Sequence, residues 1–151
     1  LGNGEEVMLA ATDLLAETKV APELSNEAHY YRAKAYLDAG KVEGVMDDLK
    51  ILAKDTRNIY GAEAKYKVAQ IYFDAGQTGQ AEKEVLDYIE VSTPHTYWLA
   101  RSFVLLSDVY MKLGRNLDAK QYLLSLKQNY QADDDIAGMI ESRLNKLNAE
   151  N

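Results

Sequence analysis

The sequence predicts an all-α fold, built as a stack of antiparallel helix pairs. One short pattern occurs in three segments, 33–45, 69–81 and 107–119, where a small residue is followed by Tyr three positions later and by Gly four positions after the Tyr. On both sides of these glycines, apolar residues recur every third or fourth position, which is the helical period. Each repeat is therefore predicted to be a helix, a glycine turn and a second helix.

The repeat has a constant register. Its small residues are Ala33, Ala69 and Ser107, its tyrosines Tyr36, Tyr72 and Tyr110, and its glycines Gly40, Gly76 and Gly114. Successive copies are 36 and 38 residues apart. We expect the small residues where two helices approach closely, the tyrosines in the core beside them, and the glycines in the left-handed conformation that ends a helix. Gly79 has no counterpart, so the run Gly76-Gln77-Thr78-Gly79 is predicted to be a turn and not a phosphate-binding loop.

Extending this register along the chain predicts the elements in order. The helices are expected at 4–18, 24–39, 42–55, 60–75, 78–91, 95–113, 116–129 and 134–148. They group into a half repeat at 1–22, repeats at 23–58, 59–92 and 93–131, and a capping helix at 132–151. All of them are predicted to form one domain over residues 1–151.

The first residues align with the middle of a repeat. Leu1-Gly2 matches Ala39-Gly40, and Val7-Met8 matches Val45-Met46, each 38 residues further on. Residues 4–18 are then a second helix without its first helix. We expect the chain to be a fragment of a longer protein, so the lack of a visible signal peptide carries little weight.

Several helix starts and one helix face can be assigned. Thr93-Pro94 suits an N-cap followed by proline at the first helical position, and Thr78 and Asn116 are placed where caps are expected. The carboxylates of residues 133–135 suit the positive end of the last helix dipole. That last helix carries one apolar stripe, made of Ile136, Ile140, Leu144 and Leu147, and is predicted to cover the last repeat while its other face meets water.

The joint pattern, small-x-x-Tyr-x-x-x-Gly followed by Ala-x-x-x-apolar, resembles the tetratricopeptide repeat. Its length and ends such as LKQNYQAD are similar to the long-repeat bacterial type found in envelope assembly and division factors. The chain departs from the family at the tryptophan site, which holds His29, Lys65 and Phe103, and at the leucine site, which holds Arg32, Val68 and Leu106. The resemblance implies a right-handed superhelical stack with a concave groove lined by the first helices.

The resemblance also implies groove residues. Carried over position by position, they are Tyr30, Lys34, Leu37, Tyr66, Gln70, Phe73, Val104, Asp108 and Met111, flanked by Glu27, Asp38, Glu63, Asp74, Arg101 and Lys112. Rigid tyrosines such as Tyr30 and Tyr66 suit peptide binding, or else they pack between neighbouring repeats. The Lys/Asn clamp that some family members use for C-terminal carboxylates is not present. Trp98, beside Tyr97, is either core or an exposed aromatic edge.

Composition and motifs disfavour several classes of function. The net charge of -7, from 24 acidic and 17 basic residues, disfavours nucleic acid and anionic membranes as partners. Absence of cysteine excludes disulfides and thiol catalysis, and no apolar run is long enough to cross a membrane. His29 and His95 lack metal-ligand spacing. The acidic pairs Glu5-Glu6, Asp47-Asp48, Glu82 with Glu84, and the run Asp133 to Asp135 are predicted to be solvated.

The sequence therefore predicts a protein–protein interaction scaffold without enzymatic activity, metal or cofactor, whose concave groove binds a peptide or a partner surface. One alternative is a purely structural C-terminal end of a longer solenoid. Another is an enzyme or enzyme-regulating domain, which would show a closed pocket around a histidine in contact with a carboxylate. The repeat type favours the cell envelope or periplasm, with the cytoplasm as the alternative.

Overall fold

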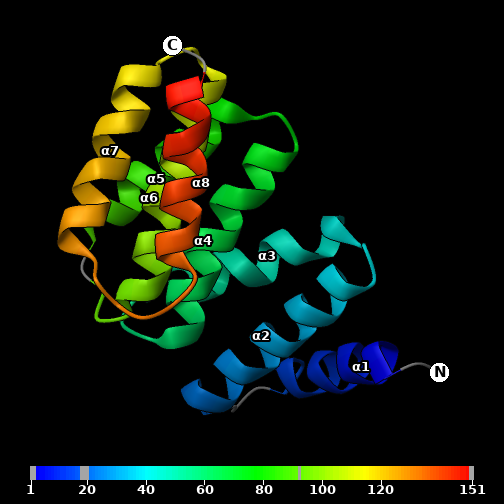
Figure 1. Ribbon diagram of the computed structural model, residues 1–151. Helices are drawn as coiled ribbons and strands as arrows, with labels where there is room; N and C mark the ends of the chain where they lie inside the picture. Colours follow the sequence, from blue (N-terminus) through cyan, green and yellow to red (C-terminus); the bar gives the residue numbers. More distant parts are fainter. Residues whose placement is uncertain (1–2, 18–20, 92, 150–151) are drawn as a thin grey trace. The chain divides into compact units, whose positions relative to one another are not determined.

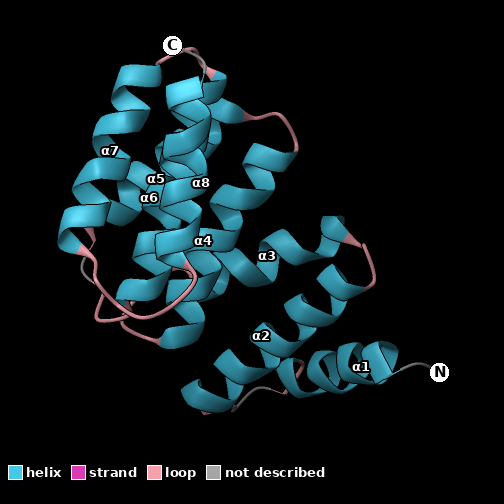
Figure 2. Cartoon of the chain, viewed as in Figure 1, coloured by secondary structure: helices cyan, strands magenta, loops and turns pink. Residues whose placement is uncertain are grey.

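The chain is all-helical in the residues described by this computed structural model, which are 3–17, 21–91 and 93–149. These residues form eight helices and no strand (Figure 2). The helices are α1 (Asn3–Leu15), α2 (Pro22–Asp38), α3 (Val42–Leu52), α4 (Ile59–Asp74), α5 (Thr78–Glu90), α6 (Thr96–Lys112), α7 (Asn116–Asn129) and α8 (Ile136–Ala149). Each corresponds to one predicted helix, and the prediction of an all-α fold is confirmed.

The three glycine turns share one hydrogen-bond pattern. Gly40, Gly76 and Gly114 have φ angles of 71°, 79° and 76°, in the left-handed region that glycine adopts without a Cβ penalty. The N–H of the residue after each glycine donates to the carbonyl of the repeat tyrosine, at 2.8 Å in all three turns. This is the Schellman arrangement, and it explains why the Tyr-to-Gly spacing is constant. The predicted equivalent at Gly2 lies outside the described residues.

The predicted N-caps are wrong. Helices α5 and α7 start at Thr78 and Asn116 themselves, with Gln77 and Arg115 at the cap positions and no side-chain cap bond. Helix α6 starts at Thr96, two residues later than Thr93-Pro94 predicts. The Thr93 hydroxyl instead accepts a hydrogen bond from the His95 N–H at 3.1 Å, so it stabilises the turn before the helix.

The helices form two compact units, residues 1–68 and 69–151, which divide within α4. In the first unit, α2 packs against both α1 and α3. In the second unit, α6 packs against α5, α7 and α8, and α6, α7 and α8 lie side by side (Figure 1). Helix α6 is thus the central element of the second unit.

The core residues of the two units largely match the predicted register. The small residues Ala33, Ala69 and Ser107 are at most 1% exposed, as predicted for positions of close helix approach. Tyr110 is buried at 4% exposure, whereas Tyr36 and Tyr72 are only half-buried. The Tyr36 ring covers Gly44 of α3, where an added Cβ would lie 3.2 Å from it.

Helix α8 covers α6 and α7 in the second unit with the predicted stripe. The four residues of this stripe, Ile136, Ile140, Leu144 and Leu147, are all buried, with exposures of 0 to 7%. Asp134, just before the helix, accepts the Ile136 N–H at 2.9 Å and the Tyr130 hydroxyl at 2.6 Å. Asp134 therefore lies at the helix start as predicted, but α8 begins at Ile136 and its first turn holds no acidic residue.

Candidate interaction surface

A hollow of about 310 Å³ opens on the second unit, lined by Phe73, Asp108, Met111, Lys112 and Lys146. Three elements supply these residues: the last turn of α4, the C-terminal half of α6, and α8. Asp108, Met111 and Lys112 share one face of α6, because residues three and four apart are neighbours on a helix.

The hollow brings together several predicted groove residues. Phe73, Asp108 and Met111 were assigned to the groove, and Lys112 to its flank, from their positions in the repeat. Lys146 was not assigned, because the capping helix was interpreted only through its apolar stripe. Its place one residue before the buried Leu147, at the edge of that stripe, is the signal that could have identified it.

The electrostatics of the hollow depend on one ion pair. Arg143 of α8 holds both carboxylate oxygens of Asp108, with Nε to Oδ1 at 2.7 Å and Nη2 to Oδ2 at 2.9 Å. Its Nη1 also donates to the Met139 carbonyl at 3.1 Å. The Lys112 ammonium lies 5.8 Å from the centre of the Phe73 ring. The lining thus has one neutralised carboxylate, two ammonium groups, and the apolar surface of Phe73 and Met111.

In the first unit, the predicted groove residues include Tyr30, Lys34 and Leu37. Tyr30 is half-buried, and its ring lies 4.5 Å from the Tyr60 ring and 5.4 Å from the Tyr31 ring, measured between centroids. Its hydroxyl donates to Glu63 at 3.3 Å. Burial, and then the Glu63 carboxylate, raise the pKa of Tyr30 to about 12. Lys34 is exposed and Leu37 is half-buried.

Two predicted groove residues are buried instead. Tyr66 is 6% exposed and Val104 is 3% exposed, so neither offers surface to a partner. Val104 lies on α6, which is covered by helices on several sides. The burial of Tyr66 is consistent with the alternative that this side chain packs inside the protein, and not with peptide binding. Gln70 donates to Asp74 at 2.8 Å within α4.

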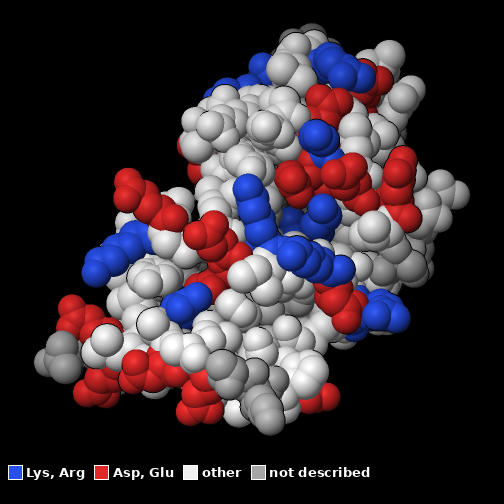
Figure 3. Space-filling view, turned by 180° about the vertical axis from the view of Figure 1, so that it is seen from behind, with Lys and Arg blue, Asp and Glu red and all other residues white. Residues whose placement is uncertain are grey.

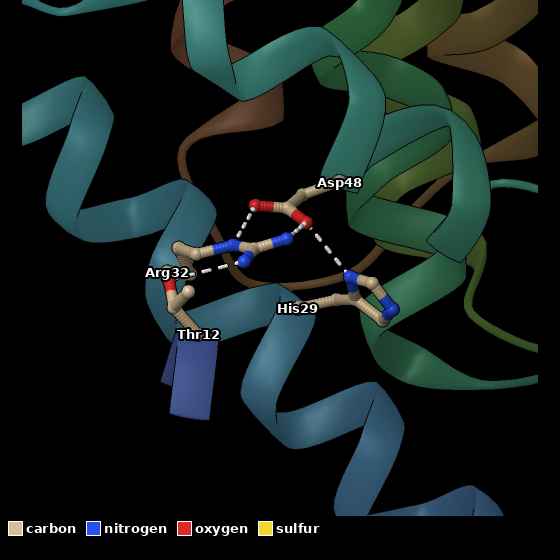
Figure 4. A network of polar contacts seen from close by, with 4 residues as sticks. All are labelled: Thr12, His29, Arg32 and Asp48. Carbon is tan, nitrogen blue, oxygen red and sulfur yellow. Dashed lines mark hydrogen bonds and ion pairs between the residues drawn. The ribbon is translucent and has the colours of Figure 1, made fainter. Parts of the chain in front are cut away.

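A polar cluster, made of Thr12, His29, Arg32 and Asp48, joins α1, α2 and α3 (Figure 4). Asp48 is fully buried and accepts hydrogen bonds from Arg32 Nε at 2.7 Å and Nη2 at 2.6 Å. His29 Nδ1 lies 2.7 Å from Asp48 Oδ1, and Arg32 Nη1 donates to the Thr12 hydroxyl at 3.1 Å. The prediction that Asp48 is solvated is wrong. Asp48 falls on the apolar stripe of α3 with Val45, Leu49 and Leu52, and that spacing was the available signal.

The enzyme alternative requires a closed pocket around a histidine that contacts a carboxylate, and this cluster supplies only the contact. A histidine does contact a carboxylate, but Arg32 occupies both oxygens of that carboxylate and the His29 side chain is only 12% exposed. The cluster connects three packed helices, so a structural role accounts for it. His95 is half-buried ahead of α6.

A second hollow, of about 370 Å³, lies on α6 and α7. Its aromatic residues are Phe103, Tyr110 and Tyr122, with Tyr122 centred 6.1 Å from Phe103 and 5.6 Å from Tyr110. The Arg115 guanidinium lies 4.3 Å from the Tyr110 ring centre. Tyr97 and Trp98 are both half-buried, and their rings make an edge contact at 5.0 Å, so Trp98 is neither fully core nor freely exposed.

Charges of both signs are interspersed over the face in Figure 3. Over the described ranges, no three potential ligands gather closely enough to hold a metal ion. None of the helices described is long and apolar enough to span a membrane. Comparison with family models, with curated proteins and with solved structures finds no match for this chain.

Proposed function

We propose that this protein is an interaction module. In this proposal its helix pairs form a right-handed superhelical stack of the tetratricopeptide type, and the first helix of each pair contributes to binding a peptide or a partner surface. The observation that carries the proposal is the hollow between α4, α6 and α8, where three of the predicted groove residues, Phe73, Asp108 and Met111, come together.

The chemistry of the hollow supports peptide binding. Phe73 and Met111 supply polarisable apolar surface, and both are half-buried, so their rotamers are restrained before a ligand arrives. Asp108 is fixed to α8 through Arg143, which holds the walls of the hollow together. The lining joins the apolar surface of Phe73 and Met111 to the charged groups of Asp108, Lys112 and Lys146, so an amphipathic segment of a partner would find both kinds of contact there.

The structural alternative makes a different prediction. If the chain only ends a longer solenoid, the hollow binds nothing, and its residues matter for stability alone. Selection of peptides on the purified chain decides between these alternatives.

The experiment is a display selection of random peptides on the purified chain, followed by fluorescence anisotropy of the enriched peptides. We expect Met111→Ala to weaken binding by about tenfold, because truncating an interface anchor typically costs more than about 1 kcal/mol. Leu124→Ala is the matched control, since Leu124 is an apolar residue of α7, 46% exposed, outside the hollow.

Far-UV circular dichroism and thermal unfolding establish that both variants remain folded. Two results would overturn the proposal: no peptide is enriched, or the enriched peptides bind the Met111→Ala and Leu124→Ala variants equally well.

A further inference from the structure

We propose that the hollow recognises an acidic peptide segment, with one side-chain carboxylate of the peptide between Lys112 and Lys146 and its apolar neighbour on Phe73 and Met111. This inference rests on the proposed function and adds the chemistry of the partner.

The lining of the hollow carries an excess of positive charge. Among the described residues that line the hollow, Asp108 is the only one with a carboxylate, and both of its oxygens are held by Arg143. Among the described residues, no carboxylate oxygen lies within ion-pair distance of Lys112 or Lys146. Within the described part of the chain, the hollow therefore presents two ammonium groups without a counter-ion, and a carboxylate from a partner would complete the balance.

Asp108 and Lys112 lie on the same helix, yet Asp108 pairs with Arg143. They are four residues apart on α6, the spacing at which an acid and a base usually pair on a helix. Here Arg143 holds the carboxylate in a two-pronged contact, and a planar guanidinium fits a carboxylate better than an ammonium does. Arg143 is thus a positioning residue, because it keeps Asp108 from neutralising Lys112.

Apolar surface lies beside the Lys112 ammonium. The Lys112 ammonium stands over the Phe73 ring at 5.8 Å, so a bound carboxylate would lie next to an aromatic surface. A cation–π contact at an exposed site is weak, and it leaves the ammonium able to accept an anion. The neighbouring apolar side chain of the peptide would then contact Phe73 and Met111.

The charge of the surrounding unit favours a single carboxylate over a polyanion. Residues 69–151 contain 8 Lys and Arg and 12 Asp and Glu, for a net charge of -4. Nucleic acid would be repelled by this unit as a whole, whereas one carboxylate within the hollow is screened from distant charges beyond about 8 Å at physiological salt.

The test is a titration of the isotopically labelled protein, followed by the amide resonances of Met111, Lys112 and Lys146. The probes are two end-blocked peptides that differ only at one position. One has Glu before Leu, and the other has Gln before Leu. We expect the Glu peptide to shift these resonances and to bind about three- to tenfold more tightly than the Gln peptide.

Variants assign the preference to the hollow. Lys112→Gln with Lys146→Gln should remove the difference between the Glu and Gln peptides. The control, Lys83→Gln with Lys120→Gln, changes the same amount of charge on α5 and α7 and should leave the difference intact. Arg143→Gln should reduce the preference, because Asp108 is then free to pair with Lys112, and Asp108→Asn with Arg143→Gln should restore it.

The outcomes separate the two proposals. If both peptides bind the hollow equally well, the acidic preference is overturned and the interaction module stands. If neither peptide shifts these resonances, the acidic preference is overturned. The display selection then decides whether the protein is an interaction module. Tighter binding of a Gln-Leu peptide with a free C-terminus, or of a short DNA oligonucleotide, would overturn the assignment to a side-chain carboxylate.

Discussion

Gly76 and Gly79 are three residues apart, but only Gly76 has a backbone conformation that requires glycine. Gly76 has a φ of 79° and ends α4 in the left-handed region. Gly79 lies within the first turn of α5, where an added Cβ would meet nothing within 4 Å. The first glycine is required by the turn, and the second is a weak helix former in a helix.

Alanine at these two positions should therefore have effects of opposite sign. Gly76→Ala should lower the free energy of unfolding by about 1–2 kcal/mol, because an L-residue is disfavoured in the left-handed region. Gly79→Ala should raise it by about 0.5 kcal/mol, because alanine favours the helix. Urea denaturation of both variants checks this prediction, and a shift of the same sign in both would contradict it.

Gly61 shows a different requirement, which the sequence pattern did not identify. An added Cβ there would collide with the backbone carbonyl groups of Asp55 and Leu52. Gly61 lies inside α4 and outside the Tyr–Gly pattern, so nothing in the local sequence distinguishes it from a neutral helical glycine. Its requirement comes from the close approach of a neighbouring backbone, which depends on tertiary packing.

At the scale of elements, the polar cluster is the contact that joins three helices of the first unit. Asp48 is fully buried and is compensated by Arg32 and His29, with Thr12 completing the bonds of Arg32. The hydrogen bond and charge of Asp48 raise the pKa of Arg32 further above its ordinary value, although burial opposes this. Replacing such a cluster by apolar residues is often neutral, whereas removing one member leaves a buried charge without its partner.

Asp48→Ala should therefore destabilise the first unit by about 3–5 kcal/mol. Hydrogen exchange should accelerate in α2 and α3 and change little in α7 and α8, because helical repeats couple mainly to their neighbours. Asp47→Ala is the control, since Asp47 is exposed on the same helix. Equal acceleration in both units would show that the cluster stabilises the chain as a whole.

What the sequence could predict differs between local and tertiary features. The positions of the helices and the glycine turns followed from periodicity and spacing within short segments. The burial of Asp48, the burial of Val104 and the approach at Gly61 depend on which faces meet, and a single helix does not determine that. The same limit explains the hollow: three of its residues followed from the repeat, while Lys146 came from a helix without the repeat signature.

At the scale of the whole molecule, tyrosines in both units make the stability of the fold sensitive to alkaline pH. The pKa values of Tyr30 in the first unit, and of Tyr88 and Tyr130 in the second, are each raised to about 12. Burial is the largest cause in all three. Their neutral forms are therefore favoured in the folded chain, while the unfolded chain ionises near the ordinary pKa of about 10.

Stability should consequently be complete below about pH 10 and decrease as the pH rises toward 12. Tyr88, which is fully buried, should contribute about 2 kcal/mol of this loss. Tyr88→Phe should flatten the pH dependence, as measured by urea denaturation between these limits, with tyrosinate absorbance as the parallel signal. An unchanged pH dependence in the variant would contradict the assignment.

The contact between His29 and Asp48 has a counterpart between α6 and α7. Displaced by 74 residues, the same two positions hold Phe103 and Tyr122, whose rings lie 6.1 Å apart. The repeats share their small residues, tyrosines and glycines, so these features alone would allow a first helix to pair with the wrong second helix. A mispaired Phe103 would face the carboxylate of Asp48. The chemistry at this position therefore distinguishes the α2–α3 pair from the α6–α7 pair, and exchanging His29 and Asp48 for Phe and Tyr should remove that distinction.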